Sequence, residues 1–398
     1  MMSARLSSEL DRFRWIAALM VVVSHLRNLL FVDYGELAGK GLAVKLLYFI
    51  TGFGHEAVVV FFVISGLLVG GTALDKARHG RFDAADFIVH RFSRIYIVLV
   101  PALLACLLLD RIGLAHFDAA HLYSRAMPAN FHRVFADNLG WSSVLGNLAM
   151  LQHIRIDVLG SNAPLWSLSY EWWYYTLFFL AVGGVLAARN PALRLLALLA
   201  IVLILAWLPA EPALWFSLWL LGVAAAFVPL QWLRVPPLAA YALLFAALAW
   251  SRFDHSHATT DLWINFRRDA IVAAGCFVLF AALRHSTRGE IRGARFHRAM
   301  AGFSYTVYLV HVPFLVFGTA LLDTLFGIPF YRQPSARGML HFGVLLLVIY
   351  AYCFVFSLLT ERHTGRLRRW LHRLRHAAIA RRTAVAAPAA VNSLSADE

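Results

Sequence analysis

The chain has 398 residues, of which 61% are hydrophobic and only 15% are charged, and its mean hydropathy is +0.67. Soluble globular domains carry about 25% charged residues, so this composition excludes an ordinary soluble domain. The formal charge of +14 does not indicate nucleic-acid binding, because the basic residues lie in short loops between apolar segments, where membrane proteins place them.

Apolar segments long enough to cross a bilayer recur from one end of the chain to the other. We therefore predict an all-α polytopic membrane protein with about ten transmembrane helices and no fused soluble domain. The predicted spans are residues 13–31, 48–72, 93–110, 168–188, 192–209, 212–228, 237–250, 269–284, 300–322 and 339–360.

The predicted orientation places both termini in the cytoplasm. About two thirds of the 36 Lys and Arg residues then lie on the cytoplasmic side, as the positive-inside rule requires. In this arrangement residues 1–360 form the membrane domain, and the long loop 111–167 caps it on the outer side. Residues 361–398 are predicted to form a cytoplasmic tail that is first basic and then disordered.

Besides Arg27 near its end, the first predicted span contains the ionisable residues Arg14 and His25. Their separation is close to three helical turns, so both side chains leave the same face of the helix, about 16 Å apart along its axis. Hydrocarbon disfavours ionisable groups, which makes such residues functional candidates. The alternative interpretation is an arginine that reaches the membrane surface and a histidine that only caps the helix.

The second predicted span carries His55 and Glu56 in its outer half, and both are candidates for the same reason. The segment also contains small residues that let neighbouring helices approach closely: Gly52, Gly54, Ser65 and Gly66.

The third predicted span begins with Arg91 and Arg94. A spacing of three places both guanidinium groups on one helical face at the cytoplasmic end. Paired arginines suit phosphate groups, because each presents a planar set of donors. Ordinary flanking charge in contact with lipid phosphates is the alternative.

The stretch LWSLSYEWWYY places Glu171 among aromatic residues at the start of the fourth span. An interfacial aromatic belt accounts for the rings but not for the carboxylate, so we expect a histidine or arginine partner on another helix. Tyr170 is a further candidate in this stretch. His311 lies in the middle of the ninth span, just before Pro313, and is either functional or a hydrogen-bonded core histidine.

The sequence shows no metal-ligand spacing, and we predict neither a metal site nor a permanently bound cofactor. The cysteines lie inside apolar spans and the loop histidines are irregularly spaced: Cys106, Cys276, Cys353, His116, His121 and His132.

Taken together, these stretches resemble the membrane acyltransferase-3 family, whose members O-acylate sugars and cell-envelope polymers in bacterial inner membranes. Many members carry an acidic residue where this chain has Val59, and Glu56, one helical turn earlier, is the candidate substitute. The matching segments follow the family's order: Arg14 with His25, VVVFFVISG at 58–66, RFSR at 91–94, LWSLSYEWWYY at 165–175 and SYTVYLVHVP at 304–313.

The resemblance implies an acyl-CoA co-substrate, usually acetyl-CoA, on the cytoplasmic side. Its phosphates would meet Arg14, Arg91 and Arg94, and its extended arm would bring the thioester near His25. His25 would then act as general base, with Glu171 or Glu56 as its partner, or as a nucleophile that carries the acyl group outward.

The resemblance also implies the acceptor, a hydroxyl of a glycan or lipid-linked sugar that enters from the outer side of the bilayer. A transporter or flippase that moves an acylated lipid or sugar is the alternative from a different functional class, because it too would use charges inside the membrane.

Overall fold

The computed structural model describes residues 3–126, 133–229, 234–253 and 261–386. Within these ranges the chain is helical, and two isolated bridges are its only strand-like pairings. The helices are α1 (Ala4–Leu30), α2 (Leu42–Ile50), α3 (Gly54–Ser65), α4 (Gly71–Arg78), α5 (Ala84–His116), α6 (Trp141–Leu148), α7 (Leu165–Phe179), α8 (Pro191–Trp207), α9 (Ala210–Ala225), α10 (Pro237–Phe253), α11 (Leu262–Arg284), α12 (Ala294–Ala301), α13 (Ser304–Phe326), α14 (Ala336–Leu359) and α15 (Thr364–Ala386).

Each predicted span coincides with a helix, which confirms the all-α polytopic membrane class. Helices α8, α9 and α10 are apolar but shorter than the five helical segments that are long and apolar enough to cross a membrane. Those five are Ala4–Leu30, Leu42–Arg78, Ala84–His116, Ser304–Phe326 and Ala336–Ala378.

Short irregular segments interrupt or extend the predicted helices. The chain turns at residues 51–53, so the helix of the second span begins only at Gly54. Two π-helical segments, η2 (Gly66–Gly70) and η4 (Leu180–Leu186), continue α3 and α7, and a 3-10 turn, η7 (Glu361–His363), joins α14 to α15. The turns of a π-helix are wider than those of an α-helix, and they often occur at functional sites.

Polar side chains fix where several helices begin. The hydroxyl of Ser3 accepts a hydrogen bond from the backbone N–H of Leu6 at the start of α1. Asp83 accepts from the first backbone N–H groups of α5, and Ser335 does the same for α14. Such caps satisfy donors that have no partner within the helix, so the sequence sets the register of α1 and α5, which carry three of the candidate arginines.

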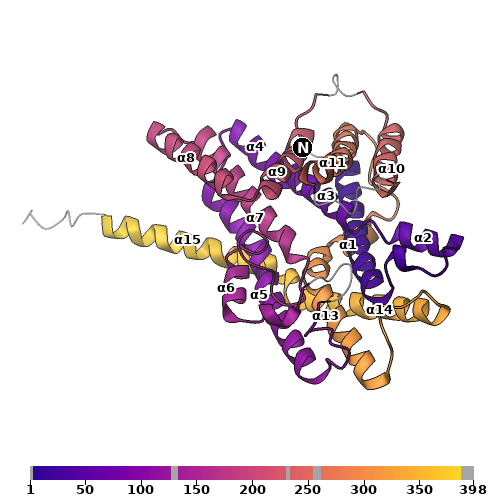
Figure 1. Ribbon diagram of the computed structural model, residues 1–398. Coiled ribbons are helices and arrows are strands. Elements are labelled where there is room, and N and C mark those ends of the chain that lie inside the picture. Colours follow the sequence, from indigo (N-terminus) through magenta and orange to yellow (C-terminus); the bar gives the residue numbers. More distant parts are fainter. Residues whose placement is uncertain (1–2, 127–132, 230–233, 254–260, 387–398) are drawn as a thin grey trace, which may run out of the picture.

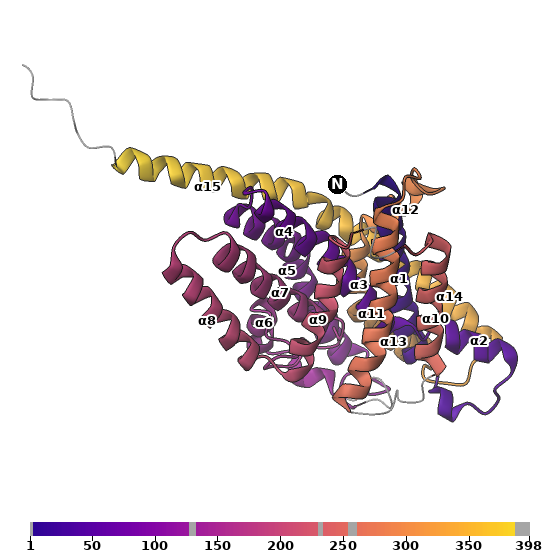
Figure 2. The same cartoon turned by 90° about the horizontal axis from the view of Figure 1, so that it is seen from above.

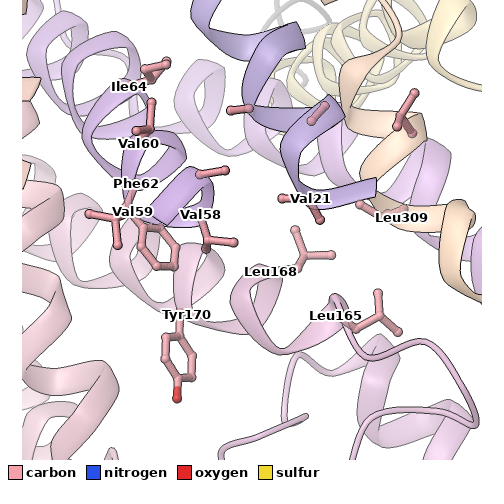
Figure 3. Packing of buried hydrophobic residues seen from close by; sticks show 14 of the residues in the cluster. Val21, Val58, Val59, Val60, Phe62, Ile64, Leu165, Leu168, Tyr170 and Leu309 are labelled. Carbon is pink, nitrogen blue, oxygen red and sulfur yellow. The ribbon is translucent and has the colours of Figure 1, made fainter. Parts of the chain in front are cut away.

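Helix α1 lies inside the bundle, against α3, α11, α12, α13 and α14 (Figure 1). Helix α5 packs against α13 and α15. Figure 2 shows that the beginning of α1, α12 and α15 all lie at one end of the bundle. The side chains of Val21, Val58, Leu168 and Leu309 come from four different helices and point into a shared apolar interior (Figure 3).

Glycines bring α3 and its π-helical continuation into close contact with α9. A Cβ atom added at Gly66 would lie 1.9 Å from the carbonyl oxygen of Trp219, and one added at Gly222 would lie 2.0 Å from that of Val63. Neither distance is possible for real atoms, so each position requires glycine. The predicted close approach of helices at Gly66 is confirmed, and it follows the small-residue rule of membrane helix packing.

We expect Gly66→Ala to lower the free energy of unfolding by about 1–3 kcal/mol, because overpacking forces α9 away from the π-helical segment. The measurement is the thermal unfolding midpoint of the detergent-purified protein. Gly343→Ala in α14 is the matched control, because its added Cβ meets no atom within 4 Å. Equal midpoints for the two variants would show that the close contact does not contribute to stability.

The predicted cap and tail have helical parts. Within 111–167, α5 continues to His116, a 3-10 turn forms at Phe135–Asn138, and α6 follows, while residues 127–132 lie outside the described residues. The basic part of the tail forms α15. Most of the predicted disordered part, from residue 387 on, lies outside the described residues.

Candidate active site

A cavity of about 630 Å³ lies between α1, α3, α5, α7 and α13, and the start of α15 lines it as well. Its volume falls within the range of about 300–1,000 Å³ that is typical of small-molecule sites. Most of the wall is apolar, and the charged and polar side chains on it are Arg14, Ser65, Arg91, Arg94, Ser167, Glu171, Tyr175, Ser304, Tyr305, Tyr308, Glu361, Thr364 and Arg368.

The three arginines predicted to act together do line this one cavity, although they come from two helices. Arg94 donates from Nη1 to Glu361 Oε1 at 2.5 Å, so a carboxylate balances its charge. Arg91 lies over the ring of Tyr175, 5.6 Å from the centroid, and has no ion-pair partner among the described residues. Arg14 Nη1 lies 3.7 Å from Asp11 Oδ1, so this ion pair is weak. Of these three, Arg91 and Arg14 are therefore the arginines best able to bind an anion.

Glu361 is the site residue that sequence analysis missed. It was assigned to the beginning of the tail, yet it is only 5% exposed and lines the cavity. Besides Arg94, it accepts hydrogen bonds at Oε2 from the backbone N–H and the hydroxyl of Thr306, at 2.9 and 2.7 Å. The available signal was an acidic residue at the end of an apolar span, immediately before a strongly basic segment.

Glu171 lines the cavity at the end of a chain of hydrogen bonds. Trp219 Nε1 donates to Ser65 Oγ at 3.1 Å, Ser65 lies 3.0 Å from the hydroxyl of Tyr175, and Tyr175 donates to Glu171 Oε1 at 2.5 Å. Because the tryptophan can only donate and the carboxylate only accept, the chain has one direction. It holds Glu171 in place on the wall that faces the arginines.

His25 pairs with another histidine. Its Nδ1 is 3.0 Å from Nε2 of His311, whose own Nδ1 lies 2.8 Å from the carbonyl oxygen of Val307 and 3.1 Å from that of Tyr308. A carbonyl can only accept, so His311 carries its proton on Nδ1, and its neutral ring accepts at Nε2 from His25 Nδ1–H. The Nε2 atom of His25 then keeps a lone pair, as a general base or a nucleophile requires.

Tyr308 connects the histidine pair to the cavity. It lines the cavity, its ring centroid is 6.4 Å from that of His311, and its hydroxyl is 2.6 Å from Ser167 Oγ. His311 is fully buried, whereas His25 is only partly buried. The pair therefore lies directly behind one wall of the arginine-lined cavity.

The expectation that Glu171 or Glu56 is the hydrogen-bond partner of His25 is wrong, because His311 occupies that position. Glu171 bonds to Tyr175, and Glu56 Oε1 accepts from Ser251 Oγ at 3.0 Å. The spacing within α3 gives no information about which helices lie next to Glu56.

Besides His25 and His311, three further candidates lie outside the cavity lining and bond to other groups. His55 Nε2 is 2.9 Å from Asp269 Oδ1. Tyr170 is buried, and its hydroxyl is 2.9 Å from His153 Nδ1. Glu56 is buried as well, and its Oε2 has no hydrogen-bond partner among the described residues. His55 and Glu56 thus form polar contacts from α3 to α11 and α10, and Tyr170 forms one from α7 to the turn at His153; all three are separate from the arginine cluster.

Comparison with known proteins identifies the family. The acyltransferase domain family matches residues 7–371, nearly the whole chain. This chain belongs to that family of acyltransferases. This match confirms the resemblance to the membrane acyltransferase-3 family. It favours an enzyme over the alternative function of a transporter or flippase.

Two relatives of this acyltransferase have names that agree with the family. The chain is 25% identical over 378 residues to the acyltransferase MdmB of Streptomyces mycarofaciens. The aligned region covers 86% of this chain and 87% of the relative. It is 26% identical over 195 residues to an O-acetyl transferase of Shigella phage Sf6, about half of each protein (49% and 51%). No solved structure matches the chain.

Proposed function

We propose that this membrane acyltransferase moves a short acyl group, most simply acetyl, from cytoplasmic acyl-CoA to a hydroxyl of an extracytoplasmic or lipid-linked carbohydrate. The proposal places it in the inner membrane of a bacterium with both termini in the cytoplasm. The observation that carries it is the cavity that joins Arg14, Arg91 and Arg94 to a wall backed by His25 and His311. The O-acetyl transferase among the relatives supports acetyl as the group.

The donor would bind with its phosphates at the arginines. Guanidinium groups suit phosphate oxygens, and Arg91, which lacks an ion-pair partner among the described residues, would gain the most from an anion. A second hollow of about 160 Å³ also contains Arg91, together with Lys76, His90 and Phe87, but Asp83 and Asp86 line it as well, and Asp86 pairs with Lys76 at 3.2 Å. The larger cavity, which all three arginines line, is therefore the better site for the donor phosphates.

The chemistry would begin with proton removal by His25 Nε2. The acceptor oxygen forms a bond to the thioester carbon as its proton passes to His25, and the carbon–sulfur bond then breaks. The proton moves from His25 to the leaving thiolate, so the products are an ester and coenzyme A thiol. Histidine is suited to this exchange near neutral pH, and His311 would hold its ring in the required tautomer.

The same lone pair supports a second route. His25 Nε2 could attack the thioester, hold the acyl group as an acyl-imidazole and pass it to the hydroxyl in a second step. Rapid quenching of enzyme mixed with radiolabelled acyl-CoA without acceptor separates the two routes, because only the second labels the protein. We favour the general-base route, because it transfers the acyl group only once.

The acceptor would reach the site from the side of the 111–167 segment. This segment contains α6 and a 3-10 turn, and a long structured loop can cover a bulky substrate. Glu171, which Tyr175 holds on the cavity wall, would be the carboxylate that contacts a hydroxyl of the acceptor. Glu56, bonded to Ser251, is placed instead for a structural contact.

The test of the proposed acceptor is chemical. We expect deletion of the gene to remove a short-chain acyl ester from one envelope or secreted polysaccharide, measured by release of the acid under mild alkali. A wild-type copy should restore the ester and a His25→Ala copy should not. If every glycan keeps its ester content in the deletion strain, the acceptor is not a glycan.

A further inference from the structure

Helix α15 leaves the bundle and runs sideways. It begins at Thr364, next to the cavity, and Figure 2 shows it passing along the end of the bundle that carries α12 and the N-terminus and continuing beyond the other helices. Its 23 residues correspond to about 34 Å of helix. A helix that lies across the ends of membrane-spanning helices is placed at the level of the membrane surface.

One face of α15 attaches it to α5. Arg375 Nη1 donates to Asp83 Oδ2 at 2.9 Å, and His372 Nε2 is 3.5 Å from Asp86 Oδ1. The hydrogen bond from Arg375 holds the pKa of Asp83 below its usual range, so this carboxylate is ionised at neutral pH. On the same face, one and two turns earlier, Arg368 and Thr364 line the cavity. The helix is therefore fixed along one side.

A second face of α15 is basic and exposed. It carries Arg366, Arg369, Arg373 and His376, which follow one another at intervals of three or four residues. No carboxylate lies within ion-pair distance of these three arginines among the described residues. Their charges are available to a negatively charged surface.

The third face is apolar. Leu367, Trp370, Leu371 and Leu374 are spaced as i, i+3, i+4 and i+7, the pattern of a helical stripe. Trp370 is 50% exposed and Leu374 is 48% exposed. A tryptophan at the edge between an apolar and a basic face is typical of helices that lie in the membrane interface.

We infer that α15 is an interfacial helix: its apolar stripe (Leu367, Trp370, Leu371 and Leu374) enters the bilayer surface, and its basic face binds anionic lipid headgroups. Charge complementarity selects the occupant, because an anionic leaflet offers many phosphates to a row of arginines beside an apolar stripe. The lipid contact would also steady Thr364, Gly365 and Arg368, which form part of the cavity wall. The inference does not depend on the identity of donor or acceptor.

The test uses the full-length protein in nanodiscs of phosphatidylcholine with or without phosphatidylglycerol. A fluorophore is placed at Leu374→Cys on the apolar stripe or at His376→Cys on the basic face; the natural cysteines are buried. We expect lipids brominated near the headgroup to quench the Leu374 label at least threefold more than the His376 label. Aqueous iodide should give the reverse order.

The anionic lipid requirement has its own comparison. Phosphatidylglycerol should increase quenching at Leu374→Cys, and Arg366→Gln with Arg369→Gln and Arg373→Gln should remove that increase. These exchanges leave the contacts with α5 intact. Equal lipid quenching at the two positions would overturn the interfacial placement. A phosphatidylglycerol effect that persists in the triple variant would overturn the assignment of the basic face.

Discussion

Replacement of His25 by alanine is expected to lower acyl transfer by about 10²–10⁴-fold, the usual contribution of a positioned acid–base group. Binding of the donor should change little, because its phosphates would bind at the arginines, and Arg14 lies about three helical turns along α1 from His25. The measurement is single-turnover transfer from radiolabelled acyl-CoA by the purified protein in nanodiscs, together with equilibrium binding of coenzyme A.

Two histidine variants make this result specific. His79→Ala removes an exposed histidine at the end of α4 and should leave transfer unchanged. His311→Gln should leave donor binding intact but reduce transfer, with an altered pH profile, because the tautomer of His25 is no longer fixed. Wild-type turnover in His25→Ala would rule out both the general-base and the acyl-histidine route.

Replacement of Arg91 by glutamine is expected to weaken donor binding more than tenfold, which corresponds to the loss of a charge-assisted contact of roughly 1.5–3 kcal/mol. The fold should be unaffected, because Arg91 has no ion-pair partner among the described residues. Equilibrium binding of coenzyme A, measured beside the thermal unfolding midpoint, separates these two effects.

Arg94 provides the contrast, because its expected defect is structural. Arg94→Ala leaves Glu361 buried without its cation, which costs up to about 3–5 kcal/mol of stability. The double variant with Glu361→Ala should recover much of that loss. If Arg91→Gln binds coenzyme A as tightly as the wild type does, the donor phosphates do not bind at this cavity.

Much of the fold was predictable because the signals are local. Apolar length alone located the helices of the predicted spans. The glycine at position 66 indicated a close helix contact before its partner in α9 was known. The spacing of Arg91 and Arg94 placed both on one face of α5, and both line the same cavity.

The remaining features depend on which helices are neighbours, and spacing within one helix does not determine this. Arg94 and Glu361 are 267 positions apart, and His25 and His311 are 286 positions apart. No local pattern pairs them. The contact of η2 with α9 through Gly66 and Gly222 likewise joins segments that are distant in the sequence.

We propose that acyl-CoA is the donor, and the release of its thiol is the measurement that bears on this proposal first. The purified protein in nanodiscs is mixed with acetyl-CoA and the polysaccharide that loses its ester in the deletion strain, and free thiol and new ester are measured together. We expect both to appear in equal amounts over many turnovers, and only when enzyme and acceptor are present. Ester formation without thiol release, or thiol release without ester, would contradict it.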